Sequence, residues 1–177
     1  MAWEWVTTME PIFENENVLS RAQLLEYYRF ICKKETRKAA AIQGLGVAVL
    51  AGFTVLNYFD PLFVILTAWL VSLLIKTLHR PENEANKVYD QRIAYYDDVM
   101  SVTRVQFGEQ IVVETKDGVR RIGYRKIENV LSLEHSYIIC DKLPGVTFLS
   151  RNGFTKGTFE EFKQFLREKR PDLNIPE

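Results

Sequence analysis

The sequence predicts an α+β protein in which a two-span transmembrane helical hairpin is followed by a strongly bent antiparallel β-sheet or barrel, closed by a C-terminal helix. Residues 39–75 contain one charged side chain, Asp60, whereas the flanking segments hold nearly all the others. From residue 102 onward the apolar residues fall in short runs separated by turn residues, in place of helical spacing. We therefore expect a membrane-embedded segment joined to a soluble domain.

The overall composition limits the classes of function. The 177 residues include 23 Lys and Arg against 23 Asp and Glu. A zero net charge is unlike the basic excess of proteins that hold nucleic acid by its phosphates, so we expect no nucleic-acid partner. Disorder is disfavoured by the 47% of apolar and 12% of aromatic residues. The two cysteines, Cys32 and Cys140, lack CxxC spacing and suit a reducing compartment.

Residues 1–38 are expected to form a cytoplasmic N-terminal segment that contains a helix. Ser20 and Gln23 have the spacing of a helix-capping box, which predicts a helix beginning at Arg21. The segment ends in a basic run over residues 33–38, immediately before the first uncharged stretch.

Residues 39–78 are expected to form the transmembrane hairpin. Residues 39–59 are 21 residues without a charge, and a helix of that length rises about 30 Å, the thickness of a hydrocarbon core. Pro61 suits the first turn of a second span over residues 61–78. The alternative is a hairpin buried in a soluble protein, which would need covering layers of amphipathic helix that this chain does not supply.

The charges at the two ends of the hairpin predict its orientation. Basic residues flank both spans, whereas the loop between them carries only Asp60; these basic residues are Lys33, Lys34, Arg37 and Lys38 before the first span, and Lys76 and Arg80 after the second. Because basic residues remain on the cytoplasmic side, we expect a multi-pass protein with both termini in the cytoplasm.

Small residues recur along one side of each span. They are Ala40, Gly44, Ala48 and Gly52 in the first span, and Ala68 and Ser72 in the second. Small side chains at a spacing of four permit close approach of two helix backbones. We expect this stripe to pack within the hairpin, and the alternative is the seam of a homodimer.

Beyond the hairpin, residues 79–101 are expected to form an amphipathic connector and residues 102–177 a cytoplasmic domain. Apolar residues of the connector repeat at steps of three and four, at Ala85, Tyr89, Ile93, Tyr96 and Met100. Six short strands follow, over residues 102–107, 110–115, 119–124, 127–133, 136–141 and 146–150. Thr158 and Glu161 predict a capped final helix that stops at Arg170-Pro171. We expect residues 82–177 to fold without the hairpin.

The order of these parts, together with four local patterns, resembles a known family. The patterns are Phe107-Gly-Glu-Gln-Ile-Val-Val-Glu-Thr, Tyr124-Arg-Lys-Ile-Glu-Asn-Val, Tyr137-Ile-Ile and Thr158-Phe-Glu-Glu-Phe-Lys-Gln-Phe. Over nearly the whole chain they are similar to the YcxB-like family of small bacterial membrane proteins. The resemblance implies residence in the bacterial cytoplasmic (inner) membrane and a C-terminal pleckstrin-homology-like (PH-like) domain. It implies no established activity. Tyr124 stands where the family pattern leads us to expect Trp, and an aromatic core side chain suits that place.

The sequence offers no recognisable catalytic or metal site. His79 and His135 lie in different parts of the chain, and neither is spaced from another His or Cys as zinc ligands are. Glu134 and His135 could form an acid–base pair, but they fall at an expected hairpin tip, where solvation disfavours catalysis. We therefore expect a protein that is not an enzyme and has no cofactor.

A basic cluster in the predicted domain is the strongest candidate for binding. It comprises Arg120, Arg121, Arg125 and Lys126. Strand alternation sends Arg120 and Arg121 to opposite faces, which favours a solvated surface over one patch. The leading hypothesis is an integral membrane protein whose domain interacts with or regulates an unidentified protein. The alternative is a module that senses anionic membrane lipids through this cluster.

Overall fold

The computed structural model describes residues 10–57, 60–96, 102–142 and 145–176, and they form two compact units. The sheet unit comprises residues 1–23 and 93–177, and the helical unit comprises residues 24–92. Each unit is described by itself. The sheet unit is discontinuous in sequence, because the helical unit is inserted into it.

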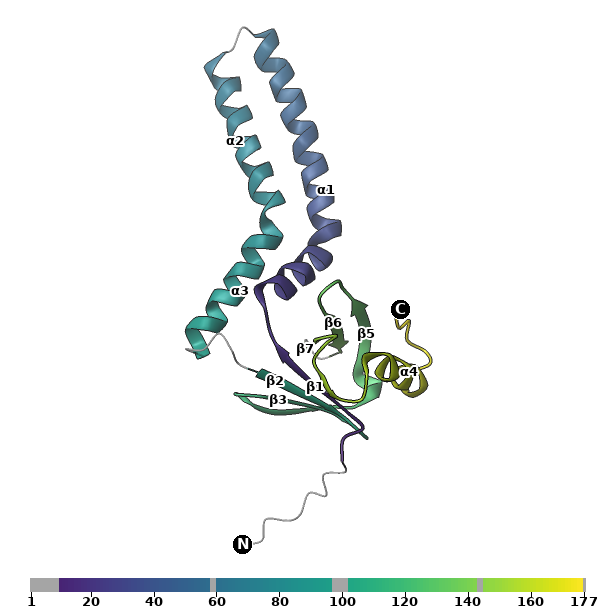
Figure 1. The fold of residues 1–177 in the computed structure, drawn as a ribbon. Coiled ribbons are helices and arrows are strands. Elements are labelled where there is room, and N and C mark those ends of the chain that lie inside the picture. Colours follow the sequence, from purple (N-terminus) through teal and green to yellow (C-terminus); the bar gives the residue numbers. More distant parts are fainter. Residues whose placement is uncertain (1–9, 58–59, 97–101, 143–144, 177) are drawn as a thin grey trace. The chain divides into compact units, whose positions relative to one another are not determined.

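The helical unit is built from three helices (Figure 1), α1 (Arg21–Leu56), α2 (Pro61–Leu78) and α3 (Arg80–Tyr96). The capping box predicted at Ser20 is confirmed, since the Gln23 amide donates to Ser20 Oγ and Gln23 Oε1 accepts from the Ser20 amide. α1 continues through the basic run without a break. Asp60 caps α2 by accepting from the Leu62 amide at 2.9 Å, and Pro61 occupies the first turn. Of the expected connector, Met100 lies outside the described residues.

Two of these helices are long and apolar enough to cross a membrane. Mean hydropathy reaches 1.9 in α1 and 2.0 in α2, and no described residue of α2 is buried. Large apolar side chains point outward from both, with Ile42 74%, Leu45 69%, Ile65 65% and Trp69 61% exposed. Such exposure disagrees with a hairpin buried in a soluble core, where these side chains would be covered.

The sheet unit contains two antiparallel sheets. Five strands lie in the order β4-β3-β2-β1-β8 and three in the order β5-β6-β7. Their bounds are β1 Phe13–Val18, β2 Val102–Phe107, β3 Ile111–Thr115, β4 Gly118–Ile122, β5 Ile127–Ser132, β6 Tyr137–Asp141, β7 Gly145–Leu149 and β8 Phe154–Lys156. All six predicted strands are confirmed within one or two residues. Among the described residues the strands form two sheets and no closed barrel, which corrects the barrel alternative.

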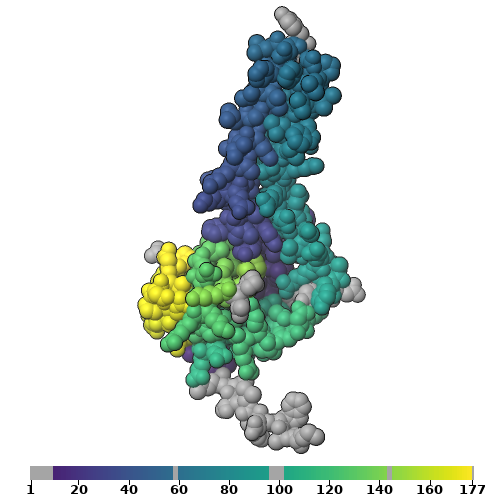
Figure 2. All heavy atoms as spheres, turned by 180° about the vertical axis from the view of Figure 1, so that it is seen from behind, coloured from purple at the N-terminus to yellow at the C-terminus, as the bar shows by residue number. Residues whose placement is uncertain are grey.

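Helix α4 (Phe159–Lys169) packs on the core that the two sheets share, and the yellow C-terminal segment lies against the green strands in Figure 2. The capping box predicted for it is confirmed, with Thr158 Oγ1 and the Glu161 side chain each accepting from the other residue's backbone amide. Phe162 is fully buried, and its ring centroid lies 4.5 Å from that of Phe107. Tyr124, the expected aromatic core residue, is buried beside Phe165.

Strand β1 was not predicted from the sequence. It pairs with β2 along its whole length, from Phe13↔Phe107 to Val18↔Val102, and its other edge pairs with β8. The expected division at residue 102 therefore leaves one strand of the larger sheet in the N-terminal segment. The helical hairpin is an insertion between two strands that are hydrogen-bonded neighbours.

Two buried asparagines explain why β1 escaped prediction. Asn15 and Asn17 face inward where apolar residues are expected of a strand, and they are 0% and 3% exposed. The Asn15 amide donates to the Ser150 carbonyl at 2.7 Å, and its Oδ1 accepts from the Ser150 amide at 3.1 Å. Asn17 Oδ1 accepts from Gln23 Nε2 at 3.1 Å, which ties β1 to the start of α1. These partners satisfy polar groups that would be costly to bury alone.

The first prediction tests the role of β1. Because Val18 and Val102 are paired, an Asn-Gly turn in place of residues 19–101 should join β1 directly to β2 as a two-residue hairpin. We expect this shortened protein to be soluble and to unfold cooperatively on heating, followed by circular dichroism. Asn15→Ala in it should cost about 1–3 kcal/mol, because the Ser150 groups lose their partner.

The matched control is a fragment that begins at residue 102 and lacks only β1 and the turn. We expect it to be largely unfolded, in contrast to the earlier expectation for residues 82–177. Equal melting temperatures for the two proteins would contradict the structural role assigned to β1.

Candidate functional site

Arg120, the first member of the basic cluster, links the two sheets. It extends from β4 and donates to Asp141 Oδ2 on β6 and to Thr147 Oγ1 on β7, each at 3.0 Å. The Asp141 side chain is only 4% exposed, so the guanidinium supplies the charge partner that a buried carboxylate needs. Glycine at position 145 leaves room for this side chain, because a Cβ there would overlap the Arg120 guanidinium. Arg120 is therefore held within the fold.

The other three cationic side chains of the cluster are exposed. Arg121 is paired with Val112 across the sheet and points away from the face that carries Arg120. Arg125 and Lys126 lie in a short 3₁₀ turn, Tyr124–Lys126, between β4 and β5. The predicted opposition of Arg120 and Arg121 agrees with this arrangement. The structure thus divides the cluster into one cation that is paired with a buried carboxylate, although its own side chain is 43% exposed, and three other exposed cations.

The turn that carries Arg125 and Lys126 is firmly held by internal hydrogen bonds. Arg170, at the end of α4, donates to the Tyr124 carbonyl at 2.6 Å and to the Ile127 carbonyl at 2.9 Å. The Tyr124 hydroxyl donates to the Gly108 carbonyl at 3.0 Å. The backbone of this turn is consequently fixed before any ligand is met, which lowers the entropy cost of binding.

Two lysines distant in sequence lie close to the same turn, and the sequence analysis missed both. The Lys142 amide donates to the Lys126 carbonyl at 2.9 Å. Lys169 places its Nζ 5.9 Å from the centre of the Tyr124 ring. Both are exposed. Lys142 directly follows β6 and Lys169 is the last residue of α4, so no local pattern could have grouped them with Arg125 and Lys126.

Within the hairpin, α1 contacts α2 through residues other than the predicted small stripe. A Cβ at Gly44 or Gly52 would meet nothing within 4 Å, whereas one at Gly46 would lie 2.8 Å from Leu70 Cδ2. The hydroxyls of Thr54 and Thr67 are 3.2 Å apart across the same contact. At about 100° per residue, Gly46 is rotated about 200° from Gly44 and faces the other way.

The remaining stripe residues Ala48, Ala68 and Ser72 are exposed, and Ala40 is half-buried. The contact inside the hairpin is therefore made elsewhere, and a stripe contact with a second copy of the chain stays a prediction.

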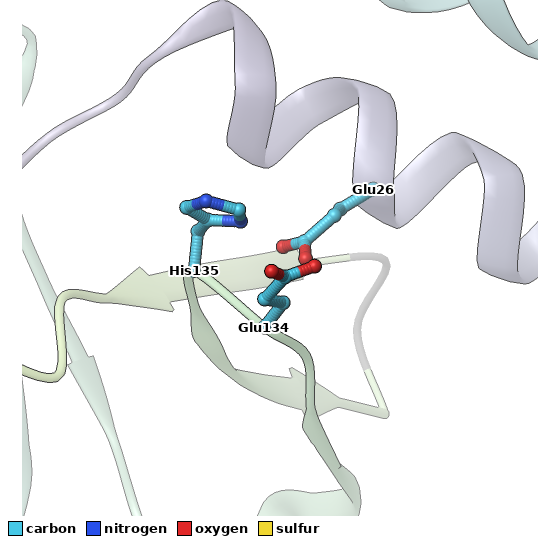
Figure 3. A group of neighbouring side chains, drawn as sticks. All are labelled: Glu26, Glu134 and His135. Carbon is cyan, nitrogen blue, oxygen red and sulfur yellow. The ribbon is translucent and has the colours of Figure 1, made fainter.

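The histidines are placed on exposed surfaces. His79 Nδ1 lies 3.2 Å from Glu82 Oε2 in the helical unit, and Arg29 donates to the other oxygen of that carboxylate at 2.8 Å. The hydrogen bond from Arg29, with a smaller contribution from His79, lowers the pKa of Glu82. Glu134 and His135 lie in the exposed turn between β5 and β6 (Figure 3). Glu26, also drawn there, belongs to the helical unit.

The described residues of each unit, taken alone, bring together no three His, Cys, Asp or Glu side chains in metal-binding geometry. Burial, followed by the nearby Asp141 and Glu128 carboxylates, raises the pKa of the Cys140 thiol. Burial also raises the pKa of Tyr137 to about 12. At neutral pH both groups stay protonated, so neither is poised as a nucleophile.

The comparisons with known proteins place the chain in no family. No family model, no curated protein and no solved structure matches it.

The second prediction concerns the hairpin contact. Gly46→Leu would place new atoms against Leu70 and should destabilise the protein by about 1–3 kcal/mol, the usual cost of overpacking. Gly44→Leu is the matched control, since the same change is made in open space on the same helix. Thermal unfolding in detergent measures both. Equal loss of stability in the two variants would show that the contact between α1 and α2 has been assigned to the wrong face of α1.

Proposed function

We propose that this chain is an integral membrane protein that presents a PH-like module for interaction with, or regulation of, another protein. The observation that carries the proposal is the pair of apolar, uncovered helices inserted between β1 and β2. In water their exposed apolar side chains would promote aggregation, whereas in a bilayer they contact lipid at no such cost. Membrane insertion thus places the exposed apolar side chains of the hairpin in contact with lipid.

The proposed topology places both termini in the cytoplasm of a bacterial inner membrane. Its support is the basic flanks at Lys33–Lys38 and at Lys76 and Arg80, compared with Asp60 at the turn. Helices interrupted by one short turn also suit two antiparallel spans. The sheet unit, which holds both ends of the described chain, then lies in the reducing compartment that its unpaired Cys140 suits.

The PH-like assignment has support from the layout of the sheet unit. Two antiparallel sheets share a core with one C-terminal helix, in agreement with the bent sheet closed by a helix that the YcxB-like resemblance implies. A non-enzymatic role has support from the solvated Glu134-His135 turn and the protonated Cys140. Interaction with another protein is proposed by analogy with the fold class, because fold alone does not specify function.

The third prediction is stable insertion with both ends inside. The native protein should remain in the membrane pellet after alkaline carbonate extraction, and reporters fused to either end should register the cytoplasm. A variant with Leu66→Lys and Leu70→Lys in α2 is the control, since each charge at mid-helix opposes insertion by about 2.5–3.5 kcal/mol. Extraction of the native protein, or an external end, would contradict the proposal.

The fourth prediction tests the interaction itself. A photo-crosslinking amino acid at exposed Val119, in the sheet unit, should capture one defined protein in native membranes. The shortened protein, with Asn-Gly in place of residues 19–101, should compete for that capture because it retains the whole module. The same amino acid at Leu45, on the apolar face of α1, is the control. If the shortened protein does not reduce the capture, the partner recognises another part of the chain.

A further inference from the structure

We propose that Arg125, Lys126, Lys142 and Lys169 form one contact surface for the phosphate groups of anionic lipid headgroups. We call this set the basic turn surface. It rests on the proposed membrane residence of the chain, since the occupant is the bilayer in which the hairpin lies. It extends the cluster seen in sequence, because two of its four members come from the residue after β6 and from the end of α4.

The first support is geometric. Lys142 is hydrogen-bonded through its backbone to Lys126, and Lys169 lies over the ring of Tyr124, the residue that precedes Arg125. Figure 1 shows α4 beside the start of β5, where this turn lies. Four exposed cations from three elements therefore meet at one place in the sheet unit.

The second support is the contrast with three other cations of the unit, each of which is paired with a carboxylate. Arg104 donates to Glu16 at 2.7 Å, Arg120 to Asp141, and Lys163 lies 2.7 Å from Glu160. Among the described residues, no ion pair within 4 Å engages Arg125, Lys126, Lys142 or Lys169. The nearby carboxylate of Asp172 is taken by two 2.7 Å hydrogen bonds from Arg170, which lower its pKa. The charge of Lys142 also lowers the pKa of Asp172, more weakly than Arg170 does, so the basic turn surface keeps most of its positive charge available.

The third support is the chemistry of the occupant. Anionic lipids give the cytoplasmic leaflet a negative surface potential, and each Lys or Arg near it is attracted about fivefold more strongly than a neutral side chain. The hairpin ties the unit to that surface, which raises the local concentration of headgroups. Because the turn is fixed by Arg170 and Tyr124, the cations need little rearrangement to meet a plane of phosphates.

The experiment uses the full chain in lipid nanodiscs. One preparation contains only phosphatidylcholine and the other equal parts of phosphatidylcholine and phosphatidylglycerol. Lysines are acylated, arginines are modified with phenylglyoxal, and the rate at each residue is read by peptide mass spectrometry. We expect anionic lipid to slow modification of Arg125, Lys126, Lys142 and Lys169 by about fivefold or more. Raising the salt from 0.1 to 1 M shortens the screening length from about 10 Å to about 3 Å and should remove the protection.

Three comparisons keep the outcome decisive. Arg104 and Lys156 report on the rest of the sheet unit, and their rates should not change; equal protection there would overturn the assignment to this surface. The Arg125→Gln/Lys126→Gln variant should lose the protection at Lys142, whereas Lys156→Gln, which removes an exposed cation elsewhere in the sheet unit, should keep it. Glycerol phosphate added to phosphatidylcholine nanodiscs should give no protection; if it protects as well as the lipid does, the site binds free phosphate and the lipid proposal is wrong.

The outcome is also separable from the proposed membrane residence. Co-elution of the chain with the nanodisc is measured first, and its absence would refute membrane residence and, with it, the bilayer as the occupant of the surface. Equal modification rates in both nanodiscs, with co-elution intact, would refute the basic turn surface and leave residence standing.

Discussion

The pairing of β1 with β2 is the constraint on which the rest of the structure depends. The two strands are neighbours in the sheet, yet residues 19–101 separate them in the chain. The larger sheet can therefore close only after the whole helical segment has been made. Contacts between residues so far apart in sequence form late and slowly, because loop closure costs entropy before any contact compensates it. Insertion of the hairpin into a bilayer would hold the ends of β1 and β2 near one surface and lower the entropy cost of bringing the two strands together.

The inward-facing asparagines of β1 make its pairing with β2 specific as well as stable. An inward Asn costs free energy unless its amide finds both a donor and an acceptor, and the Ser150 backbone supplies both to Asn15. A one-residue slip of β1 would turn Asn15 outward and bury Glu14 or Glu16, which normally bond to Gln106 and Arg104 on the outer face. The buried amides therefore exclude the wrong register. Gly153 has a matching role, since a Cβ there would overlap the Glu16 carbonyl.

Local sequence signals predicted most helices and strands well. Pairing between segments distant in the chain could not be predicted from the sequence. Capping residues such as Ser20 and Thr158 marked helix starts, and short apolar runs bounded by turn residues marked all six predicted strands, because both signals act within a few residues of the chain. β1 could not be recognised, since Asn15 and Asn17 become acceptable only beside Ser150 and Gln23. The four-residue spacing of Gly44, Ala48 and Gly52 described one face of a helix correctly. It could not say which face meets α2, because Gly46 on the opposite side is equally small.

Contacts between segments distant in the chain also decide which cations of the basic cluster are paired within the fold. Along β4, alternation alone predicts that Arg120 and Arg121 point to opposite faces, and the structure agrees. Alternation cannot tell which of the two meets a carboxylate, because Asp141 lies on the other sheet. Arg120 is engaged by Asp141 and Thr147, whereas Lys142, which follows β6, and Lys169, at the end of α4, join the cluster at its other end. The charge available to a ligand is thus set by tertiary contacts, and it lies at the turn before β5, beyond the end of the strand where the sequence concentrates it.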